Sequence, residues 1–318
     1  MTTLRCLLLA GGCSLLLNTG CGSNEPNKEE AKTIAADSVK QKEPGHKEEA
    51  PVPAALTIRY HAYPVKGVDT AVKTFRKTYS AEQRWLILAL NRLDNGSIGR
   101  ADTLIVPDTL LPDMGAYSPF PAEVPMLKDV NKFVIFSYPI QAFAAYEKGK
   151  RVYWGPTSMG SKIHPTPTGL HFANWKAKET ISTVNDEWKL KWNFNIANKE
   201  GVGWHQYSMP GYPASHSCLR MLAEQAQWMY SWAEQWIVQG TSTVLAQGTP
   251  VIVYGAYPFG SRRPWRNMLE NAKANEISIA DIEKEIEPYL QRILEQQQRR
   301  EGIISQRQQP DTAAKPAS

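Results

Sequence analysis

The segment 133-FVIFSYPIQAFAAYEKGKRVYW-154 decides the fold of this chain. Residues 133–146 are rich in β-branched and aromatic side chains, which predicts two strands. Residues 147–150 predict the turn of a β-hairpin, because the glycine can adopt the special backbone angles of a tight turn. Residues 151–154 are then the returning strand, and an antiparallel sheet is expected here.

The rest of residues 131–256 continues in the same way. Further strands are predicted near residues 169–174, 188–192, 202–206 and 249–254. One helix is predicted over about 221–238, because apolar residues recur there at helical spacing. These residues are Leu222, Ala226, Met229, Ala233 and Trp236. The expected fold class is therefore mostly β (α+β), with one packed helix.

Residues 56–110 have a different pattern. A strand is predicted at 56–60, two short helices at 69–79 and 80–91, and a second strand that ends at Pro107. This order predicts a small N-terminal α/β subdomain. A proline-rich connector, residues 111–130, joins it to the β-rich domain.

Residues 257–318 are expected to form a helical tail. Their periodicity and charge predict helix over 264–300, with Ser278 and Asp281 near a helix start. The last dozen or so residues are polar and are expected to be disordered.

The N-terminus has the pattern of a secretory signal over residues 1–20: a positive charge at Arg5, an apolar run, and small residues before Cys21. Its end resembles a bacterial lipoprotein processing site. Cys13 is the alternative, but Cys21 follows the longer apolar run and is the expected lipidation residue. A cysteine that carries more than one acyl chain anchors a protein stably at a membrane. Residues 21–55 have few large apolar side chains and are expected to be a disordered tether.

The net charge and the number of cysteines narrow the classes of function that this protein could have. A formal charge of +5 over 318 residues, without an arginine-rich stripe, does not indicate nucleic-acid binding. Of the four cysteines, processing at Cys21 would remove Cys6 and Cys13 and lipidate the third. Cys218 would then be a lone thiol in an oxidising compartment, with no intrachain disulfide partner. Such a thiol is a candidate nucleophile.

Cys218 lies in the stretch 204-WHQYSMPGYPASHSCLRM-221, most of which is predicted to be a loop. The thiolate is the reactive form, and its pKa falls near an imidazolium, a helix N-terminus or a positive charge. His205 and His216 could supply the imidazolium, Arg220 the charge, and the predicted helix its free amides. The same amides could stabilise an oxyanion in acyl transfer.

Two other interpretations of this stretch stay open. His205, His216 and Cys218 could be zinc ligands, although no further ligand motif accompanies them. Alternatively, the cysteine is buried and structural, and the two histidines are merely hydrogen-bonded.

The stretch resembles the catalytic signature of the L,D-transpeptidase family (YkuD-type domain): a histidine on a strand, a loop, then Ser/Thr-X-Gly-Cys. Three more segments stand in the family's order. They are the hairpin 146–150, the S-x-G…TPTG-x-F segment at 157–172, and the closing strand 248–254. The resemblance covers residues 131–256 and implies an L,D-transpeptidase-type β-sandwich. The chain departs from it at Ser217, which replaces a glycine, and in the short span of thirteen residues from His205 to Cys218. If position 217 needs a positive φ, serine tolerates it poorly.

The resemblance implies a role for each matched residue. Cys218 would be the acylated nucleophile and His205 the base that takes its proton. The residues expected to support the oxyanion and the loop are Ser217, Ser215 and Arg220. The residues expected to line the groove are His216, Tyr207 and Trp204. No metal and no cofactor is implied.

The implied function is acyl transfer between peptidoglycan stem peptides, at the periplasm or cell wall, with a membrane contact through Cys21. Carbapenem acylation of the cysteine is implied as well. Three alternatives remain: an L,D-carboxypeptidase, an enzyme that attaches proteins to peptidoglycan, and a non-catalytic cell-wall-binding lipoprotein. Residues 56–110 loosely resemble a LysM peptidoglycan-binding module, which is either a glycan binder or a degenerate packing subdomain. The oligomeric state is not indicated.

Overall fold

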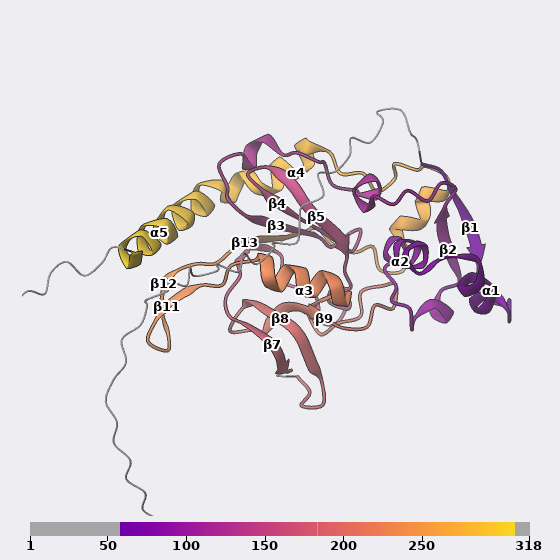
Figure 1. The fold of residues 1–318 in the computed structure, drawn as a ribbon, viewed down its shortest axis with the longest axis horizontal. Coiled ribbons are helices and arrows are strands. Elements are labelled where there is room, and N and C mark those ends of the chain that lie inside the picture. The colour runs from indigo at the N-terminus through magenta and orange to yellow at the C-terminus, as the bar shows by residue number, and fades with distance from the viewer. Residues whose placement is uncertain (1–57, 183, 309–318) are drawn as a thin grey trace, which may run out of the picture. The chain divides into compact units, whose positions relative to one another are not determined.

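Figure 1 shows the computed structural model, which describes residues 58–182 and 184–308. The expected signal segment, Cys21 and the tether lie outside the described residues, as do residues 309–318. Among the residues described, no helix combines the length and the hydrophobicity that crossing a membrane requires.

A five-stranded sheet contains the segment that opens the sequence analysis. In spatial order its strands are β5 (Lys150–Pro156), β4 (Ala142–Glu147), β3 (Phe133–Ser137), β13 (Pro250–Tyr254) and β6 (Gly169–Phe172). The predicted antiparallel hairpins are confirmed, and β13 runs parallel to β3. The turn between β4 and β5 has a positive φ at both Lys148 and Gly149, the pattern of a type I′ turn.

A four-stranded sheet carries the histidine of the candidate site. In spatial order its strands are β10 (Leu219–Met221), β9 (Val202–Gln206), β8 (Lys189–Ala197) and β7 (Lys176–Ile181). β9 lies where the sequence predicted a strand, whereas β7 and β10 were missed. β10 pairs with β9 in parallel, with Arg220 opposite His205.

The predicted helix over 221–238 is too long. The observed helix, α3, spans Ala223–Trp232, and a short hairpin of β11 (Ile237–Gln239) and β12 (Thr243–Ala246) follows it. The helix ends because the next backbone amides have other partners: Glu234 N donates to Thr249 Oγ1 at 2.9 Å, and Trp236 N donates to Asn174 O at 3.0 Å. Ala233, which the predicted stripe also contained, follows the helix and still packs on the same core.

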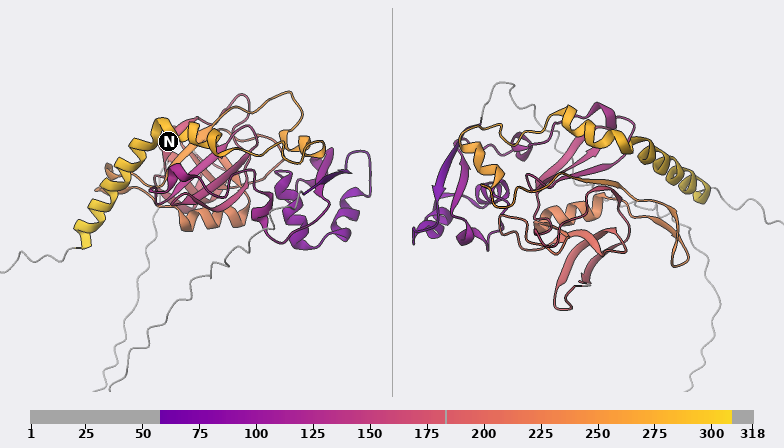
Figure 2. Two further views of the ribbon diagram at one scale, coloured as in Figure 1. Left: turned by 90° about the horizontal axis from the view of Figure 1, so that it is seen from above. Right: turned by 180° about the vertical axis from the view of Figure 1, so that it is seen from behind.

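Hydrophobic side chains cover both faces of the five-stranded sheet. Alternation along β3 sends Val134 and Phe136 to one face, where they meet Phe194 and Trp204 of the other sheet. α3 packs beside β8 and β9 at this core (Figures 1 and 2). The fold is thus α+β, with two sheets packed face to face and one helix, as the sequence predicted.

The opposite face of the five-stranded sheet is covered by segments that flank residues 131–256. Phe133 and Ile135 of β3 share a core with Trp265 and with residues of the C-terminal helices. The latter residues are Ile282, Ile286 and Ile293. The C-terminal elements are η4 (Pro264–Leu269), α4 (Ile279–Ile286), η5 (Glu287–Tyr289) and α5 (Leu290–Gln308). The predicted start at Ser278 is confirmed, since Ser278 and Asp281 form a capping box, but the predicted helix over 264–300 is wrong for residues 270–278, which are not helical.

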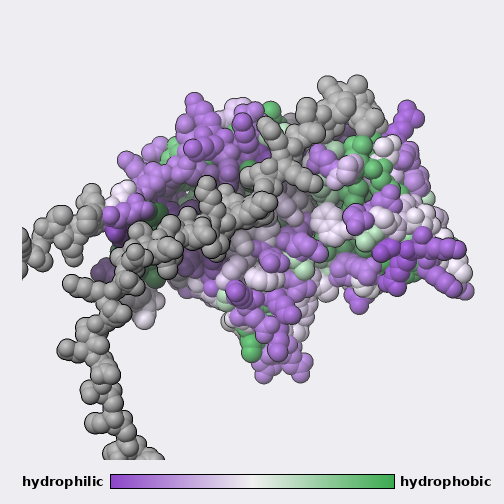
Figure 3. Space-filling model, in the orientation of Figure 1, coloured by the Kyte–Doolittle hydropathy of each residue, from purple (hydrophilic) through white to green (hydrophobic). Residues whose placement is uncertain are grey.

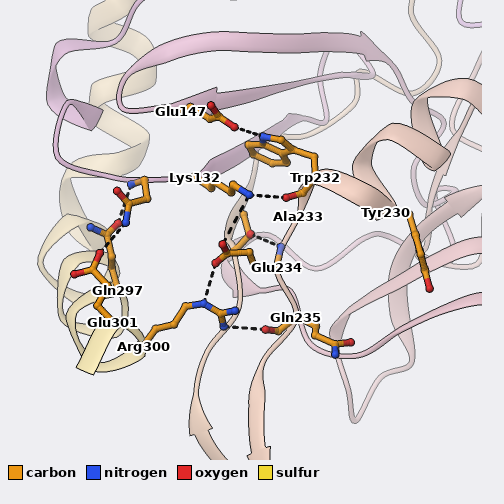
Figure 4. Close-up of polar contacts among 12 residues, drawn as sticks. Lys132, Glu147, Tyr230, Trp232, Ala233, Glu234, Gln235, Gln297, Arg300 and Glu301 are labelled. Atoms are coloured by element: carbon orange, nitrogen blue, oxygen red, sulfur yellow. Dashed lines mark hydrogen bonds and ion pairs between the residues drawn. The ribbon is translucent and has the colours of Figure 1, made fainter. Parts of the chain in front are cut away.

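Helix α5 is held by polar contacts as well (Figure 4). Arg300 lies 2.8 Å from the carboxylate of Glu234, which also faces Lys132 at 3.8 Å. Gln297 accepts a hydrogen bond of 2.8 Å from Asn131 N. These contacts join α5 to the start of β3 and to the segment after α3.

The small N-terminal unit has the predicted order of elements. They are β1 (Tyr60–Pro64), α1 (Ala71–Thr78), α2 (Ala81–Leu90), η1 (Ile98–Arg100) and β2 (Thr103–Pro107). β1 begins where its predicted strand ends, at Tyr60, and pairs antiparallel with β2. Ser80 and Gln83 form a capping box at the start of α2. The connector that follows contains η2 (Met114–Tyr117) and η3 (Pro125–Leu127).

Candidate active site

The parallel pairing of β9 and β10 brings Cys218 and His205 into one site. Cys218 immediately precedes β10, and Leu219 lies opposite Trp204, so Cys218 stands level with Gly203. Its Sγ atom lies 3.8 Å from Gly201 O. Cys218 and His205 both line a cavity of about 250 Å³. The thirteen-residue span is therefore long enough, because it only has to return the chain to the neighbouring strand.

His205 is oriented by the backbone beside it. The imidazole is 3% exposed, and its Nδ1 lies 3.1 Å from Gln206 O. In the tautomer in which Nδ1–H donates to this carbonyl, Nε2 keeps its lone pair and can accept a proton. Burial lowers the pKa of His205 to about 4, so the imidazole is neutral near pH 7.

The electrostatics of Cys218 differ from the expectation. Burial raises the pKa of the thiol, which a backbone hydrogen bond from Gly203 and the charge of Arg220 only partly oppose. The sequence predicted a pKa lowered by a helix N-terminus directly after the cysteine. That prediction is wrong because β10 stands there, and α3 begins only at Ala223. The site at rest holds a thiol and a neutral imidazole.

The loop from Tyr207 to Cys218 is bound to the segment 157–166. Ser158 and Arg220 exchange backbone hydrogen bonds of 3.1 Å in both directions. Ala214 N and Ser215 N both donate to Met159 O, at 3.0 and 3.1 Å. The TPTG segment and the cysteine loop, separate in sequence, are thus one structural unit.

Two side chains close this unit around Cys218. Ser215 Oγ donates to Cys218 O at 2.5 Å. Thr166 Oγ1 accepts from Gly160 N at 2.9 Å and donates to Ser217 O at 2.8 Å. Thr166 is 2% exposed, so it has little access to solvent. It fixes the carbonyl of the peptide bond that leads into Cys218.

Gly160 is required by the same close packing. A Cβ atom at this position would lie 2.2 Å from His164 O and 2.5 Å from Thr166 N. Both are backbone atoms, which cannot give way as a flexible side chain can. The glycine of the S-x-G segment therefore lets the TPTG turn approach the cysteine loop.

Ser217 has a φ of +78°, in the left-handed region. This angle explains why a glycine is expected at this position, and it places a strained serine directly before Cys218. The Oγ atom gains only a long contact of 3.4 Å with His164 O. Among the described residues, the amides of Ser217 and Cys218 donate to no backbone carbonyl. They remain able to donate to an oxyanion.

Aromatic rings surround the open side of the cavity. His216 stacks on His164 with ring centroids 4.2 Å apart and meets Trp188 at 5.3 Å. Arg220 lies over the ring of Tyr207 at 4.7 Å. Of these groups, Trp188, Tyr207, His216 and Arg220 line the cavity.

The β7–β8 hairpin supplies another part of the cavity wall. Ile181 and Val184, at its end, are 56% and 57% exposed, and Figure 3 shows a hydrophobic spot there. Trp188 follows them. The sequence did not predict Ile181, Val184 or Trp188 as cavity residues. It predicts a strand that begins at Trp188, and nothing in the segment marks it as part of a site.

Trp204 is not a groove residue. It is 0% exposed and packs on Phe136 and Phe194, with ring centroids 6.2 and 4.9 Å away. The reason is strand alternation, since successive side chains of β9 point to opposite faces and His205 occupies the face of the cavity.

The described residues contain no group of three or more His, Cys, Asp or Glu side chains that could hold a metal ion. In particular, His216 lies against His164 and Trp188 rather than in a ligand set with Cys218 and His205.

Comparison with known proteins concerns the part of the chain that contains His205 and Cys218. Residues 131–253 match the family model of the L,D-transpeptidase catalytic domain. No curated protein matches the chain. Among solved structures, an L,D-transpeptidase from Stackebrandtia nassauensis is 21% identical, with 40% of this chain and 57% of that chain covered and a TM-score of 0.33. One from Mycobacterium smegmatis is 20% identical, with 39% and 59% covered and a TM-score of 0.31.

The chain thus spans a little over half the length of these structures. An L,D-transpeptidase from Mycobacterium tuberculosis is 19% identical, with 48% of this chain and 72% of that chain covered and a TM-score of 0.32. The matched region contains both β-sheets of the sandwich, His205 and Cys218. The match to the L,D-transpeptidase catalytic domain is therefore a match of residues 131–253, which are about two fifths of the chain.

Proposed function

We propose that this protein is a peptidoglycan L,D-transpeptidase that transfers an acyl group through Cys218. The observation that carries the proposal is the pairing of Cys218 with His205 in one cavity of about 250 Å³, with Nδ1 of the histidine held by Gln206 O. This is the arrangement of a nucleophile, a base and a group that orients the base. Within an L,D-transpeptidase catalytic domain, it supports acyl transfer rather than a structural cysteine.

In the first step the donor stem peptide lies with its scissile carbonyl against Cys218. The thiol proton passes to Nε2 of His205 while Sγ forms a bond to the carbonyl carbon. The amides of Ser217 and Cys218 donate to the oxygen that becomes negative. When the tetrahedral intermediate collapses, the carbon–nitrogen bond breaks, and the leaving amine of the terminal D-residue takes the proton from the imidazolium.

In the second step an amine of another stem peptide attacks the thioester. It gives its proton to neutral His205, the carbon–sulfur bond breaks, and the thiolate recovers the proton. The lowered pKa of His205 suits both steps, because the base must be neutral before each attack. Arg220, at the cavity wall, is placed to attract a carboxylate of the peptide.

The proposal extends to the location of the enzyme. Lipid attachment at Cys21 and a tether through residue 55 would hold the domain outside the cytoplasm, within reach of the cell wall. This part rests on the sequence pattern alone, since Cys21 lies outside the described residues.

The decisive experiment is intact-mass analysis after treatment with a carbapenem such as imipenem. The wild-type protein should gain the mass of one acyl adduct, which peptide mapping assigns to Cys218. Cys218→Ala should gain none while its circular dichroism and Tm stay near those of the wild type. A Cys218→Ala protein that still formed the adduct, or that still turned over a stem tetrapeptide, would refute the assignment.

The reaction type needs a second measurement. With a tetrapeptide donor, a transpeptidase should form the cross-linked product when an amine acceptor is added. If only the hydrolysed tripeptide appears at every acceptor concentration, the enzyme is an L,D-carboxypeptidase.

A further inference from the structure

The small N-terminal unit touches the loop that carries the nucleophile. This contact involves residues 91–94, which follow α2, and residues 209–211, at the start of the cysteine loop. Leu93 and Pro210 form an antiparallel bridge. Residues 91–94 lie outside the segment 131–253 that matches the catalytic domain.

Asp94 binds both backbone groups of Met209. Its backbone amide donates to Met209 O at 3.0 Å, and its Oδ2 accepts from Met209 N at 2.6 Å. Met209 itself is 0% exposed and shares a hydrophobic cluster with Ala89 and Leu222. Met209 is therefore fixed both by its backbone and by its side chain.

The turn that presents Asp94 is itself rigidly held. Asn91 is buried and bonds to Ile87 O and to both backbone groups of Ile105, at 2.7 to 2.9 Å. Arg92 is 2% exposed, donates from Nε to Ile140 O at 3.0 Å, and lies 4.7 Å from the ring centroid of Trp265. Asn91 thus joins the turn to the small unit. Arg92 joins it to the connection between β3 and β4 of the five-stranded sheet.

Gly211 extends the same contact. Its φ is +82°, and a Cβ atom there would lie 3.0 Å from Leu93 Cδ2 and 3.4 Å from Asn91 O. The chain then continues to Tyr212, whose carbonyl accepts from Ser158 Oγ at 2.7 Å. The cysteine loop therefore has two supports: the turn at residues 91–94 holds its start, and the segment 157–166 holds its end.

We propose that Asp94 is a positioning residue for acyl transfer, and that the small N-terminal unit completes the active site by fixing the start of the cysteine loop. The inference rests on the proposed function of Cys218. With Asp94 in place, the path from Met209 to Cys218 has one conformation, which aligns the Ser217 and Cys218 amides with the oxyanion. Without the carboxylate, Met209 N loses its acceptor and the loop start is held less firmly, and small misplacements of reacting groups cost large factors in rate.

The test uses the full-length protein and four variants, two at Asp94 and two at control positions. Asp94→Ala removes the acceptor for Met209 N, and Asp94→Asn keeps an acceptor oxygen of the same geometry. Asp108→Ala is the matched control, since Asp108 is a carboxylate of the same unit whose side chain bonds to His61. Phe75→Leu is the stability control, because Phe75 is 0% exposed in the unit's own core.

The rate of imipenem acylation and the rate of alkylation by iodoacetamide are measured for each variant. Asp94→Ala should slow acylation about 10- to 100-fold, by the effect of a misplacement near 1 Å. Its alkylation rate should stay within about twofold, because alkylation needs the thiol but no oxyanion site. Asp94→Asn should restore most of the acylation rate, and Asp108→Ala and Phe75→Leu should keep it.

Hydrogen exchange at the Met209 amide gives a readout that does not depend on activity. The amide should lose protection in Asp94→Ala and keep it in Asp94→Asn. The proposal is overturned if Asp94→Ala keeps that protection, if it acylates at the wild-type rate, or if Phe75→Leu slows acylation as much. If the wild-type protein itself forms no adduct, the proposed function fails, and the exchange measurement still decides whether Asp94 fixes the loop.

Discussion

Replacing Ser217 with glycine tests the strain assigned to the cysteine loop. A residue with a Cβ atom pays about 1–2 kcal/mol in the left-handed region, where Ser217 has its φ of +78°. Glycine avoids this cost but loses about 0.5–1 kcal/mol through its freer unfolded chain. Ser217→Gly should therefore raise the free energy of unfolding by about 0.5–1 kcal/mol, the difference between the two effects.

The hydroxyl of Ser217 changes this balance little. Its contact with His164 O is 3.4 Å long, near the limit of a useful hydrogen bond. The matched control is Ser217→Ala, which loses the same hydroxyl but keeps the Cβ atom and the strain. Its free energy of unfolding should differ from the wild type by no more than about 0.5 kcal/mol.

The assay is thermal unfolding by calorimetry, with urea unfolding as a second measurement. For a domain of this size the gain corresponds to a Tm higher by about 1–4 °C in Ser217→Gly. Acylation by imipenem should stay near the wild-type rate, because the amides of residues 217 and 218 keep their places. If Ser217→Gly were no more stable than Ser217→Ala, the positive φ would not be a source of strain, and the argument would be refuted.

Four further outcomes follow from the site. His205→Ala should reduce kcat/KM for a stem tetrapeptide by several orders of magnitude and His216→Ala by clearly less; the reverse order would name His216 as the base. Because burial lowers the pKa of His205 to about 4, the imidazole gains its proton only near that pH, so the acid limb of kcat/KM should lie near pH 4 and not near 6.5. Gly160→Ala should lower the free energy of unfolding in urea by about 1–3 kcal/mol, since its Cβ would overlap backbone atoms. Arg220→Ala should slow alkylation of Cys218 at fixed pH, because the charge of Arg220 lowers the thiol pKa; an unchanged rate would exclude that influence.

The sequence predicted those parts of the fold that have a strong local signal. The hairpin at residues 147–150 is marked by its glycine, and the start of α4 by the capping residues Ser278 and Asp281. Strand β9 was placed correctly over 202–206. At the hairpin and at the helix start, the residues that carry the sequence signal are the same ones that form the turn and the capping box.

The errors lie where contacts distant in sequence decide the structure. The three residues of β10 are a strand only because β9 offers a free edge beside them, and nothing local distinguishes them from a helix start. The raised pKa of Cys218 was also not predicted, because its main cause is burial, which segments distant in sequence produce. The contact of Asp94 with Met209 spans 115 residues and has no signal in either segment.

The electrostatics of the site bear on how a lone thiol can persist in an oxidising compartment, where the proposed lipid anchor would hold it. Burial raises the pKa of Cys218 and lowers that of His205, so near pH 7 the resting pair is a thiol and a neutral imidazole. Because oxidation and disulfide exchange proceed through the thiolate, a protonated cysteine reacts slowly with small oxidants. In the proposed mechanism a substrate changes this state only where it supplies a carbonyl, whose developing oxyanion the loop amides would stabilise while His205 takes the proton. On this proposal Cys218 would be activated by the bound acyl donor, which would couple its reactivity to the geometry of the cysteine loop and make the two supports of the loop as important as the thiol itself.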